Sequence, residues 1–314
     1  MQRVVQLVVV LGGVSLLTFL ILNLLPGDPG LAVLGDNAPP EALEAFRSQH
    51  GLDRALHVRY FDWVSGAVTG DLGTSFRTDQ PVLETILDRV PVSLQIVVFA
   101  QILALLISVP AAIACVWKPR SWLERTINTS AFATISVPNF LAAYVLILIF
   151  AVHLGWLPAT GFSRLSNGVV ENLRSIALPT VTLALSQFGI YTRVLRSDMV
   201  DTLEQDYVTT AYGKGLTNRR ILVRHVLRGS LLSLVTVVGV NMGVLLGGAV
   251  ITETIFAIPG IGRLMIEGIA QRDLMVVQGV VLLAATAYVV LNLIVDVLYT
   301  ALDPRIELGG QRRA

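Results

Sequence analysis

Residues 90–117 read VPVSLQIVVFAQILALLISVPAAIACVW, and this stretch contains no Asp, Glu, Lys or Arg. A helix needs roughly 20 apolar residues to cross the hydrocarbon core of a bilayer, so the stretch is long enough to span it. Five more runs without these charged residues lie at residues 4–27, 126–152, 175–192, 229–252 and 274–295. The run at 175–192 is the shortest of them and contains Pro179. The sequence therefore predicts an all-α membrane protein with about six transmembrane helices.

The overall composition agrees with this prediction. Of the 314 residues, 54% are hydrophobic and 14% are charged, and the mean hydropathy is +0.70, whereas soluble domains carry about 25% charged residues. Inside a bilayer every backbone N–H and C=O group has to be paired, which helices and closed barrels achieve. The apolar runs lack the two-residue alternation of barrel strands, so helices are expected. The first run is predicted to remain as a helix, because it is longer than the core of a usual cleavable signal peptide.

The basic residues predict the orientation of the chain. Short loops rich in Lys and Arg stay in the cytoplasm. Both lysines, Lys118 and Lys214, fall in the connections 118–125 and 193–228. The second connection also contains Arg193, Arg196, Arg219, Arg220, Arg224 and Arg228. Both termini are therefore predicted to be cytoplasmic, with residues 28–89, 153–174 and 253–273 on the opposite side.

The long first loop is predicted to fold as a small extracytoplasmic cap at residues 28–89. Within it PEALEAFRSQHGL, residues 40–52, indicates a short helix with acidic residues in its first turn and Gly51 at its end. The cap is either a solvated spacer or a docking surface, and both readings stay open. The chain is thus divided into an N-terminal transmembrane helix at 1–27, the cap at 28–89 and a core with five transmembrane helices at 90–314.

The predicted spans contain no ionisable group at mid-depth, although ion-coupled transporters generally keep such groups there as their coupling device. Polar residues in the spans include Asn139, Gln187 and Asn241, which either hydrogen-bond between helices or line a passage. The sequence has no Gly-x4-Gly-Lys-Ser/Thr phosphate-binding loop and no His or Cys pair with metal-ligand spacing. The sequence shows no nucleophile, acid–base pair or metal site of the kind that a membrane enzyme would need.

Glycine and proline residues mark further features of the spans. Three glycines recur every four residues in the fifth span, namely Gly239, Gly243 and Gly247, and so share one helical face. Such a face lets another backbone approach closely, either within the chain or from a second subunit. Pro110, Pro138 and Pro179 are expected to kink spans two, three and four, because each lacks a backbone donor.

The connection between spans four and five reads RVLRSDMVDTLEQDYVTTAYGKGLTNRRILVRHVLRGS, residues 193–230. It predicts a helix near Leu203–Tyr212, a sharp turn at Gly213-Lys214-Gly215, and a third helix that begins around Thr217-Asn218. This helix–turn–helix is expected to present four side chains to a cytoplasmic partner: Tyr207, Val208, Ala211 and Leu216. The competing interpretation is an amphipathic helix lying on the membrane surface.

Residues 206–231, DYVTTAYGKGLTNRRILVRHVLRGSL, resemble the cytoplasmic loop of binding-protein-dependent ABC importer permeases, in the branch that handles dipeptides, oligopeptides and nickel. Five more motifs occur in the order of that family: LLPGDP at 24–29, GLDRALHVRYFDWVSGAVTGDLGTSF at 51–76, PV followed by a span from 81 onward, ETIFAIPGIGRLMIEGIAQRDLMVVQG at 253–279 and DVLYTALDPRI at 296–306. The sequence departs from the wider superfamily pattern at Thr209-Thr210, where alanine-like residues are usual. It departs again at residues 225–228, which replace an Ile-x-Leu-Pro element.

The resemblance implies a type I ABC importer permease fold in a bacterial cytoplasmic (inner) membrane. It also implies partners: a second homologous permease, two cytoplasmic ATPase subunits or domains, an extracytoplasmic substrate-binding protein and the lipid bilayer, with no nucleic acid. The permease itself would be non-catalytic and hold no cofactor, since ATP and Mg would bind to the ATPase subunits. The ATPase-coupling residues would be Asp206, Tyr207, Val208, Ala211, Gly213, Lys214, Gly215 and Leu216.

The resulting hypothesis is a permease subunit that forms half of the pathway of an ATP-driven importer of di- or oligopeptides. ATPase closure would move the loop and rock the helices between inward-open and outward-open states. The alternative is an ion-coupled secondary transporter or channel that acts without an ATPase. No residue of the sequence distinguishes dipeptides, oligopeptides, nickel chelates and glutathione as substrates.

Overall fold

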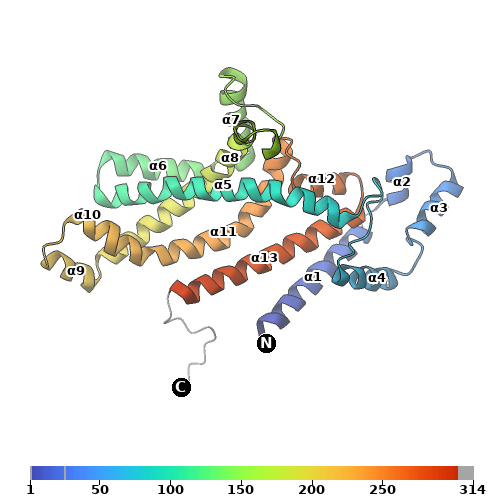
Figure 1. Ribbon diagram of the computed structural model, residues 1–314, viewed down its shortest axis with the longest axis horizontal. Helices are drawn as coiled ribbons and strands as arrows, with labels where there is room; N and C mark the ends of the chain where they lie inside the picture. Colours follow the sequence, from blue (N-terminus) through green and yellow to red (C-terminus); the bar gives the residue numbers. More distant parts are fainter. Residues whose placement is uncertain (1, 25, 303–314) are drawn as a thin grey trace. The chain divides into compact units, whose positions relative to one another are not determined.

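The computed structural model describes residues 2–24 and 26–302 (Figure 1). Over these residues the secondary structure is helical, and extended backbone pairs only in an isolated bridge between Thr74 and Pro81. Part of the motif at 296–306, and the predicted cytoplasmic end of the chain, lie beyond residue 302 and outside the described residues. The all-α class predicted from the sequence is confirmed.

Five stretches of helix are long and apolar enough to cross a membrane. They lie in α1 (Gln2–Leu24), α5 (Val82–Trp117), α8 (Val169–Leu203), α11 (Leu227–Ile255) and α13 (Leu274–Leu302). Each contains one of the predicted uncharged runs or most of it. The run at 175–192, which is short in the sequence, is the middle of the much longer α8, which also includes charged residues at both ends.

The remaining predicted span, residues 126–152, is bent. It divides into α6 (Trp122–Ser136), α7 (Asn139–Leu146) and a π-helical continuation, η1 (Ile147–His153), with an angle of 107° at the break. Val137 is extended and Pro138 precedes the first turn of α7, because proline disfavours a helical residue before it and offers no N–H to the preceding turn. The kink expected at Pro138 is therefore a complete break, whereas α5 and α8 continue through Pro110 and Pro179.

The chain forms two compact units. Over the described residues, the first comprises residues 2–24, 26–94 and Ala257–Val289, and the second comprises Gln95–Phe256 and residues 290–302. Besides parts of the long helices, the first unit contains α2 (Pro29–Leu34), α3 (Pro40–Gln49), α4 (Leu56–Thr69) and α12 (Ile261–Ala270). The second contains η2 (Leu165–Asn167), α9 (Asp206–Gly213), α10 (Asn218–Arg220) and the π-helical η3 (Ile221–Val226). The three-part division expected from the sequence stays a prediction.

The core of the first unit joins the predicted cap to α12 and α13. One cluster contains Trp63, Leu72, Val82, Ile86, Leu264, Val276 and Val280, and a second contains Phe46, Phe76 and Leu274. The predicted cap helix is confirmed as α3. Gly51, with φ +61°, follows it, and the Leu52 N–H donates to the Arg47 carbonyl at 2.8 Å, which is the bond that closes a helix with a left-handed glycine.

In the second unit α8 is the central helix and contacts α6, α7 and α11. Its side chains Leu183, Tyr191, Leu195 and Met199 are fully buried. Large apolar side chains such as Leu106 on α5 and Val244 on α11 are exposed. An apolar exterior of this kind is expected where helices face lipid, since lipid tails are as apolar as the side chains themselves.

Candidate coupling site

The predicted helix–turn–helix between spans four and five is present. After α8 ends at Leu203, α9 begins at Asp206, slightly later than expected, and ends at Gly213. The chain then turns into α10, which continues through η3 into α11 (Figure 1). We call α9, the turn at residues 214–217 and α10 the elbow. α9 packs against η3 and the end of α8, so the elbow is continuous with two long helices of the second unit.

The turn of the elbow depends on Gly215. Its φ is +74°, in the left-handed region that glycine adopts without strain. The Gly215 N–H donates to the Tyr212 carbonyl at 2.9 Å, and the Leu216 N–H donates to the Ala211 carbonyl at 3.3 Å. These two bonds form a Schellman motif, which pairs the last carbonyls of α9 and reverses the chain. Gly213, by contrast, is helical, and a Cβ added there would meet nothing within 4 Å.

The structure buries two of the elbow side chains that the sequence predicted to be exposed to a partner. Val208 and Ala211 are 0% and 5% exposed, so they pack within the chain and are not presented to a partner. An eight-residue helix has an inner face, and these two residues, three positions apart, form it. Leu216 is half-buried, while Asp206, Gly213, Lys214 and Gly215 are exposed. The exposed surface of the elbow is thus more polar than predicted.

Two tyrosines give the elbow its exposed aromatic surface. Tyr207 and Tyr212 are 49% and 47% exposed. The Tyr212 hydroxyl donates to Asn218 Oδ1 at 3.0 Å, and the Tyr207 hydroxyl lies 2.8 Å from the position that a Cβ on Gly229 would take. A hydrogen bond therefore holds the Tyr212 hydroxyl, the Tyr207 hydroxyl lies against Gly229, and both side chains keep about half of their surface exposed. Rigid, half-exposed tyrosines are typical of protein–protein interfaces.

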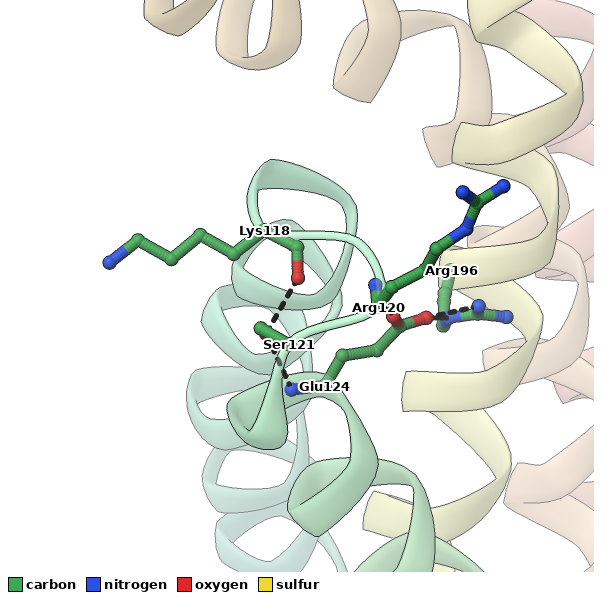
Figure 2. Close-up of polar contacts among 5 residues, drawn as sticks. All are labelled: Lys118, Arg120, Ser121, Glu124 and Arg196. Carbon is green, nitrogen blue, oxygen red and sulfur yellow. Dashed lines mark hydrogen bonds and ion pairs between the residues drawn. The ribbon is translucent and has the colours of Figure 1, made fainter.

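A polar cluster ties the start of α6 to α8, ten residues before the elbow (Figure 2). Ser121 caps α6: its Oγ accepts from the Glu124 N–H at 3.2 Å and donates to the Lys118 carbonyl at 2.6 Å. Glu124 accepts from the Arg120 N–H at 2.6 Å and forms an ion pair with Arg196 on α8, which donates through Nε at 3.0 Å and also through Nη2. The cap at Ser121 and the ion pair thus share Glu124.

Two further contacts on the same face of α8 strengthen this link. The Arg193 guanidinium lies over the Phe132 ring of α6, 4.2 Å from its centroid. At Gly189 a Cβ would lie 2.5 Å from the Ala131 carbonyl oxygen, so only glycine allows α6 to approach this closely. Residues 189, 193 and 196 follow the helical spacing of one face. Sequence reasoning placed Arg193 and Arg196 in the basic connection but missed these contacts, because Glu124 is far away in the sequence.

The expected passage residues occupy different environments in the second unit. Gln187 is 2% exposed, and its Oε1 has no hydrogen-bond partner among the described residues. Asn139 is half-buried at the start of α7, and its Nδ2 lies 3.5 Å from the Cβ position of Gly248 on α11. Asn241 is also half-buried. No hydrogen bond between described residues joins the three side chains, so their role in a passage stays a prediction.

The three glycines on one face of α11 become more exposed along the helix. Gly239 is buried, Gly243 is half-buried and Gly247 is exposed. A Cβ added at Gly247 would meet nothing within 4 Å, whereas one at Gly248 would approach Asn139 and Leu183. Packing within the chain therefore uses Gly248, and no described residue of this chain covers Gly247.

In the first unit, two family motifs meet through Asp273. This carboxylate is 4% exposed and accepts from Ser75 Oγ at 2.5 Å and from the Phe76 and Val276 N–H groups at 3.4 Å each. It joins the DLGTSF segment to the start of α13 across 198 positions of sequence. No local signal in the sequence could have revealed this pairing.

Long apolar helices joined by a polar helix–turn–helix are the architecture of a multi-pass membrane protein. The chain belongs to the family of binding-protein-dependent transport system inner membrane components, which it matches over residues 104–308. The N-terminal component of the same family matches residues 1–97. The resemblance stated from the motifs is thereby confirmed.

Two relatives and one solved structure illustrate the similarity. The dipeptide transport system permease protein of Alkalihalophilus pseudofirmus is 37% identical over 327 residues, with 98% of each chain covered. The oligopeptide transport system permease protein of Bacillus subtilis is 35% identical over 309 residues, again with 98% of each chain covered. An inward-facing MetNI methionine ABC transporter shares the fold, with a TM-score of 0.59 and 15% identity over 70% of this chain and 97% of that chain.

These similarities establish the coarse function. The chain is a multi-pass membrane protein and a permease subunit of an ATP-driven importer. The type I ABC importer permease fold expected from the sequence is confirmed. The alternative of an ion-coupled transporter that works alone is not favoured.

Proposed function

We propose that this chain forms half of the translocation pathway for di- or oligopeptides and is moved by separate ATPase subunits through its elbow. A second homologous permease completes the pathway, two ATPase subunits bind on the cytoplasmic side, and a substrate-binding protein delivers the peptide from outside. In this arrangement the termini and the elbow face the cytoplasm of a bacterium, and the chain itself holds neither ATP nor Mg.

The observation that carries this proposal is the continuity of the elbow with the core of the second unit. α9 is attached to α8 at one end and, through η3, to α11 at the other, and α8 contacts α6, α7 and α11. A force on the exposed face of α9 therefore acts on the ends of two helices that pack together. Tyr207, Tyr212 and the exposed Lys214 supply the aromatic and charged groups that would fill a groove on an ATPase.

The substrate class is supported by the relatives and by the chemistry of the interior. The relatives described above are named as dipeptide and oligopeptide permeases. The buried Gln187 and the half-buried Asn139 and Asn241 offer neutral amide groups in the second unit. Neutral amides hydrogen-bond a peptide backbone without selecting its side chains, which suits a passage whose selectivity is set by the binding protein.

Reconstitution tests the proposal. The chain is placed in proteoliposomes with its second permease and ATPase subunits, and uptake of labelled di- and oligopeptides is measured with the binding protein present. We expect uptake that requires ATP and stops when the ATPase subunits are omitted. Uphill uptake by this chain alone under a proton gradient would contradict the proposal, and so would ATP-dependent uptake of nickel chelates but not of peptides.

A further inference from the structure

A cavity of about 420 Å³ lies within the first unit, at the end of α1. Its walls come from the LLPGDP segment, from α3 and α4, and from the turn between α12 and α13. Volumes of this order hold small molecules or headgroups. The cavity is remote in sequence from the elbow, and the transport mechanism proposed above does not use it.

The cavity contains more positive charge than its own carboxylates neutralise. Its charged lining residues are Asp28, Asp273, Arg47, Arg59 and Arg272. Asp28 is bound by Arg47, which donates through Nε at 3.0 Å and also through Nη2, and Asp273 already accepts from Ser75 and two backbone N–H groups. Burial raises the pKa of Asp28, but hydrogen bonds from Arg47 and the Gly30 N–H outweigh it and hold the pKa below its ordinary value. Both carboxylates are therefore engaged.

Two cations remain for a ligand. Among the described residues, neither Arg59 nor Arg272 has a carboxylate partner. Arg59 lies over the Phe19 ring at 5.8 Å from its centroid, and burial lowers its pKa. Arg59 is half-buried, and a half-buried guanidinium without a counter-ion is costly unless an anion joins it, whereas Arg272 is exposed at the rim of the cavity.

The backbone holds Arg272 at the cavity. Its φ is +55°, which is rare for a residue with a side chain. Its Nη1 occupies the space beside Gly27, 1.6 Å from where a Cβ would sit, so the guanidinium fits there only because residue 27 is glycine. This φ belongs to the Schellman motif that ends α12, in which the Arg272 N–H donates to the Ile269 carbonyl at 3.2 Å and the Asp273 N–H donates to the Gly268 carbonyl at 2.9 Å. The end of α12 thus fixes the backbone of Arg272, and Gly27 leaves the space that its guanidinium occupies.

The remaining walls are apolar and lie where a membrane ends. Leu22, Leu52, Leu274 and Val277 line the cavity. The candidate span Leu7–Leu24 ends at the cavity, and the candidate span Leu274–Ile294 begins there. The cavity therefore lies at the depth of the lipid headgroups. Leu17, Ile21 and Leu24 of α1 are exposed, so an apolar surface for acyl chains continues from the cavity along the span.

We propose that this cavity binds the phosphate of an anionic phospholipid, held by Arg59 and Arg272, with its acyl chains along α1. Guanidinium groups bind phosphate oxygens in pairs and with fixed geometry. A phospholipid supplies the anion and the apolar chains together at the headgroup depth. An acidic side chain of a partner protein would leave the apolar wall unoccupied.

The test uses the assembled transporter in detergent, titrated with short-chain phosphatidylglycerol, with short-chain phosphatidylcholine and with inorganic phosphate. Bound lipid is counted by native mass spectrometry. The variants are Arg59→Gln, Arg272→Gln and the double change. Arg54→Gln is the matched control, because Arg54 pairs with Asp62 on the exposed surface of the same unit and does not line the cavity.

We expect the wild type and Arg54→Gln to bind phosphatidylglycerol about tenfold more tightly than phosphatidylcholine, with the preference lost in the double variant. Equal phosphatidylglycerol binding by wild type and double variant would overturn the proposal. Displacement of the lipid by an equal concentration of inorganic phosphate would indicate a free-anion site and overturn it too. A double variant with normal lipid binding but weaker capture of the substrate-binding protein would reassign the cavity to protein docking.

Discussion

Gly213 and Gly215 stand two positions apart, but the elbow uses only one of them for its conformation. Gly215 takes φ +74° and closes the Schellman motif, and nothing lies within 4 Å of its Cβ position. The requirement at 215 is therefore a matter of backbone handedness and not of space. Gly213 lies within α9 and could carry a side chain freely. Substitution of Gly215 therefore tests the turn, and substitution of Gly213 is the matched control.

Replacing Gly215 should weaken the turn. In the left-handed region Ala costs about 1–2 kcal/mol, and a β-branched residue costs more. We expect Gly215→Ala to slow ATP-dependent peptide uptake and Gly215→Val to abolish it with the complex still assembled. The measurement is uptake per ATP hydrolysed in proteoliposomes.

Gly213→Ala is the comparison for these variants. It should keep the turn intact and stabilise α9 slightly, by about 0.5–1 kcal/mol, since alanine is the better helix former, so uptake should fall far less than with Gly215→Ala. Full ATP-dependent uptake by Gly215→Val would remove the turn from the coupling mechanism.

The sequence was informative about the elbow at some residues and not at others. A glycine at the end of a short helix predicts a left-handed turn because few other residues adopt one, and Gly215 follows that rule. Val208 and Ala211 were expected to face a partner but are buried in the chain. The spacing of apolar residues in a short helix predicts that one face is buried. It does not show whether that face packs against the same chain or against a partner. Ser75 and Asp273 escaped notice because their contact is purely tertiary.

At the scale of elements, α6 and α8 behave as a pair because three contacts join them. Gly189 allows close approach, Arg193 lies over Phe132, and Arg196 binds Glu124. Glu124 is largely buried, with a side chain 12% exposed, so its ion pair is better protected from solvent than an exposed pair. Movement of the elbow would reach α6 through these contacts on α8.

A double-mutant cycle measures this link. We expect Glu124→Gln and Arg196→Gln to show a coupling energy of about 1 kcal/mol in thermal or denaturant unfolding, because each removes the partner of a partly buried charge. Each single change should also lower peptide uptake per ATP, since α6 would follow α8 less closely.

The exposed pair Arg54–Asp62 serves as the reference for that cycle. Its side chains are 62% and 60% exposed, so Arg54→Gln and Asp62→Asn should couple by only about 0–0.5 kcal/mol. Coupling energies of the same size in both cycles would mean that the Glu124–Arg196 pair does not hold the two helices together.

The elements also show which signals in the sequence were decisive. Uncharged runs predicted the positions of the long helices, because the bilayer sets a minimum apolar length whatever the tertiary fold. Proline did not predict the breaks. Pro110, Pro138 and Pro179 occur in three similar runs, yet only the run with Pro138 divides at its proline into two helices. Neighbouring helices can re-satisfy the carbonyl freed by a proline, and that help is invisible in a single sequence.

At the scale of the whole molecule, the bent pair decides how often the chain crosses the membrane. Five helices pass the test for a span individually, and α6 with α7 and η1 makes a sixth if the bent pair crosses once. Six crossings place both ends of the chain on one side, and five place them on opposite sides. The basic residues of 118–125 and 193–228 favour six, with both connections in the cytoplasm.

Cysteine labelling decides between the two counts. In a Cys115→Ala background, single cysteines replace Lys118 and Ser166, which flank the bent pair and are exposed. A membrane-impermeant maleimide should label position 166 in intact spheroplasts and position 118 only after permeabilisation, because one crossing separates them. Cysteines at Thr209 in the elbow and Arg77 in the cap provide the inner and outer references. Labelling of 118 and 166 from the same side would show that the bent pair returns without crossing.

The π-helical η3 separates the elbow from α11 by one wide turn. A turn that closes with i→i+5 bonds holds one residue more than its α-helical counterpart, so the two ends of the continuous helix are out of phase. Removing the extra residue from this turn, by conversion to α-helical hydrogen bonding, would rotate the elbow by about 100° around the axis of α11. This is the angle between successive residues of an α-helix. A shift of this π-helical turn along the helix would therefore rotate Tyr212 about the axis of α11, while α11 itself stays packed against α8.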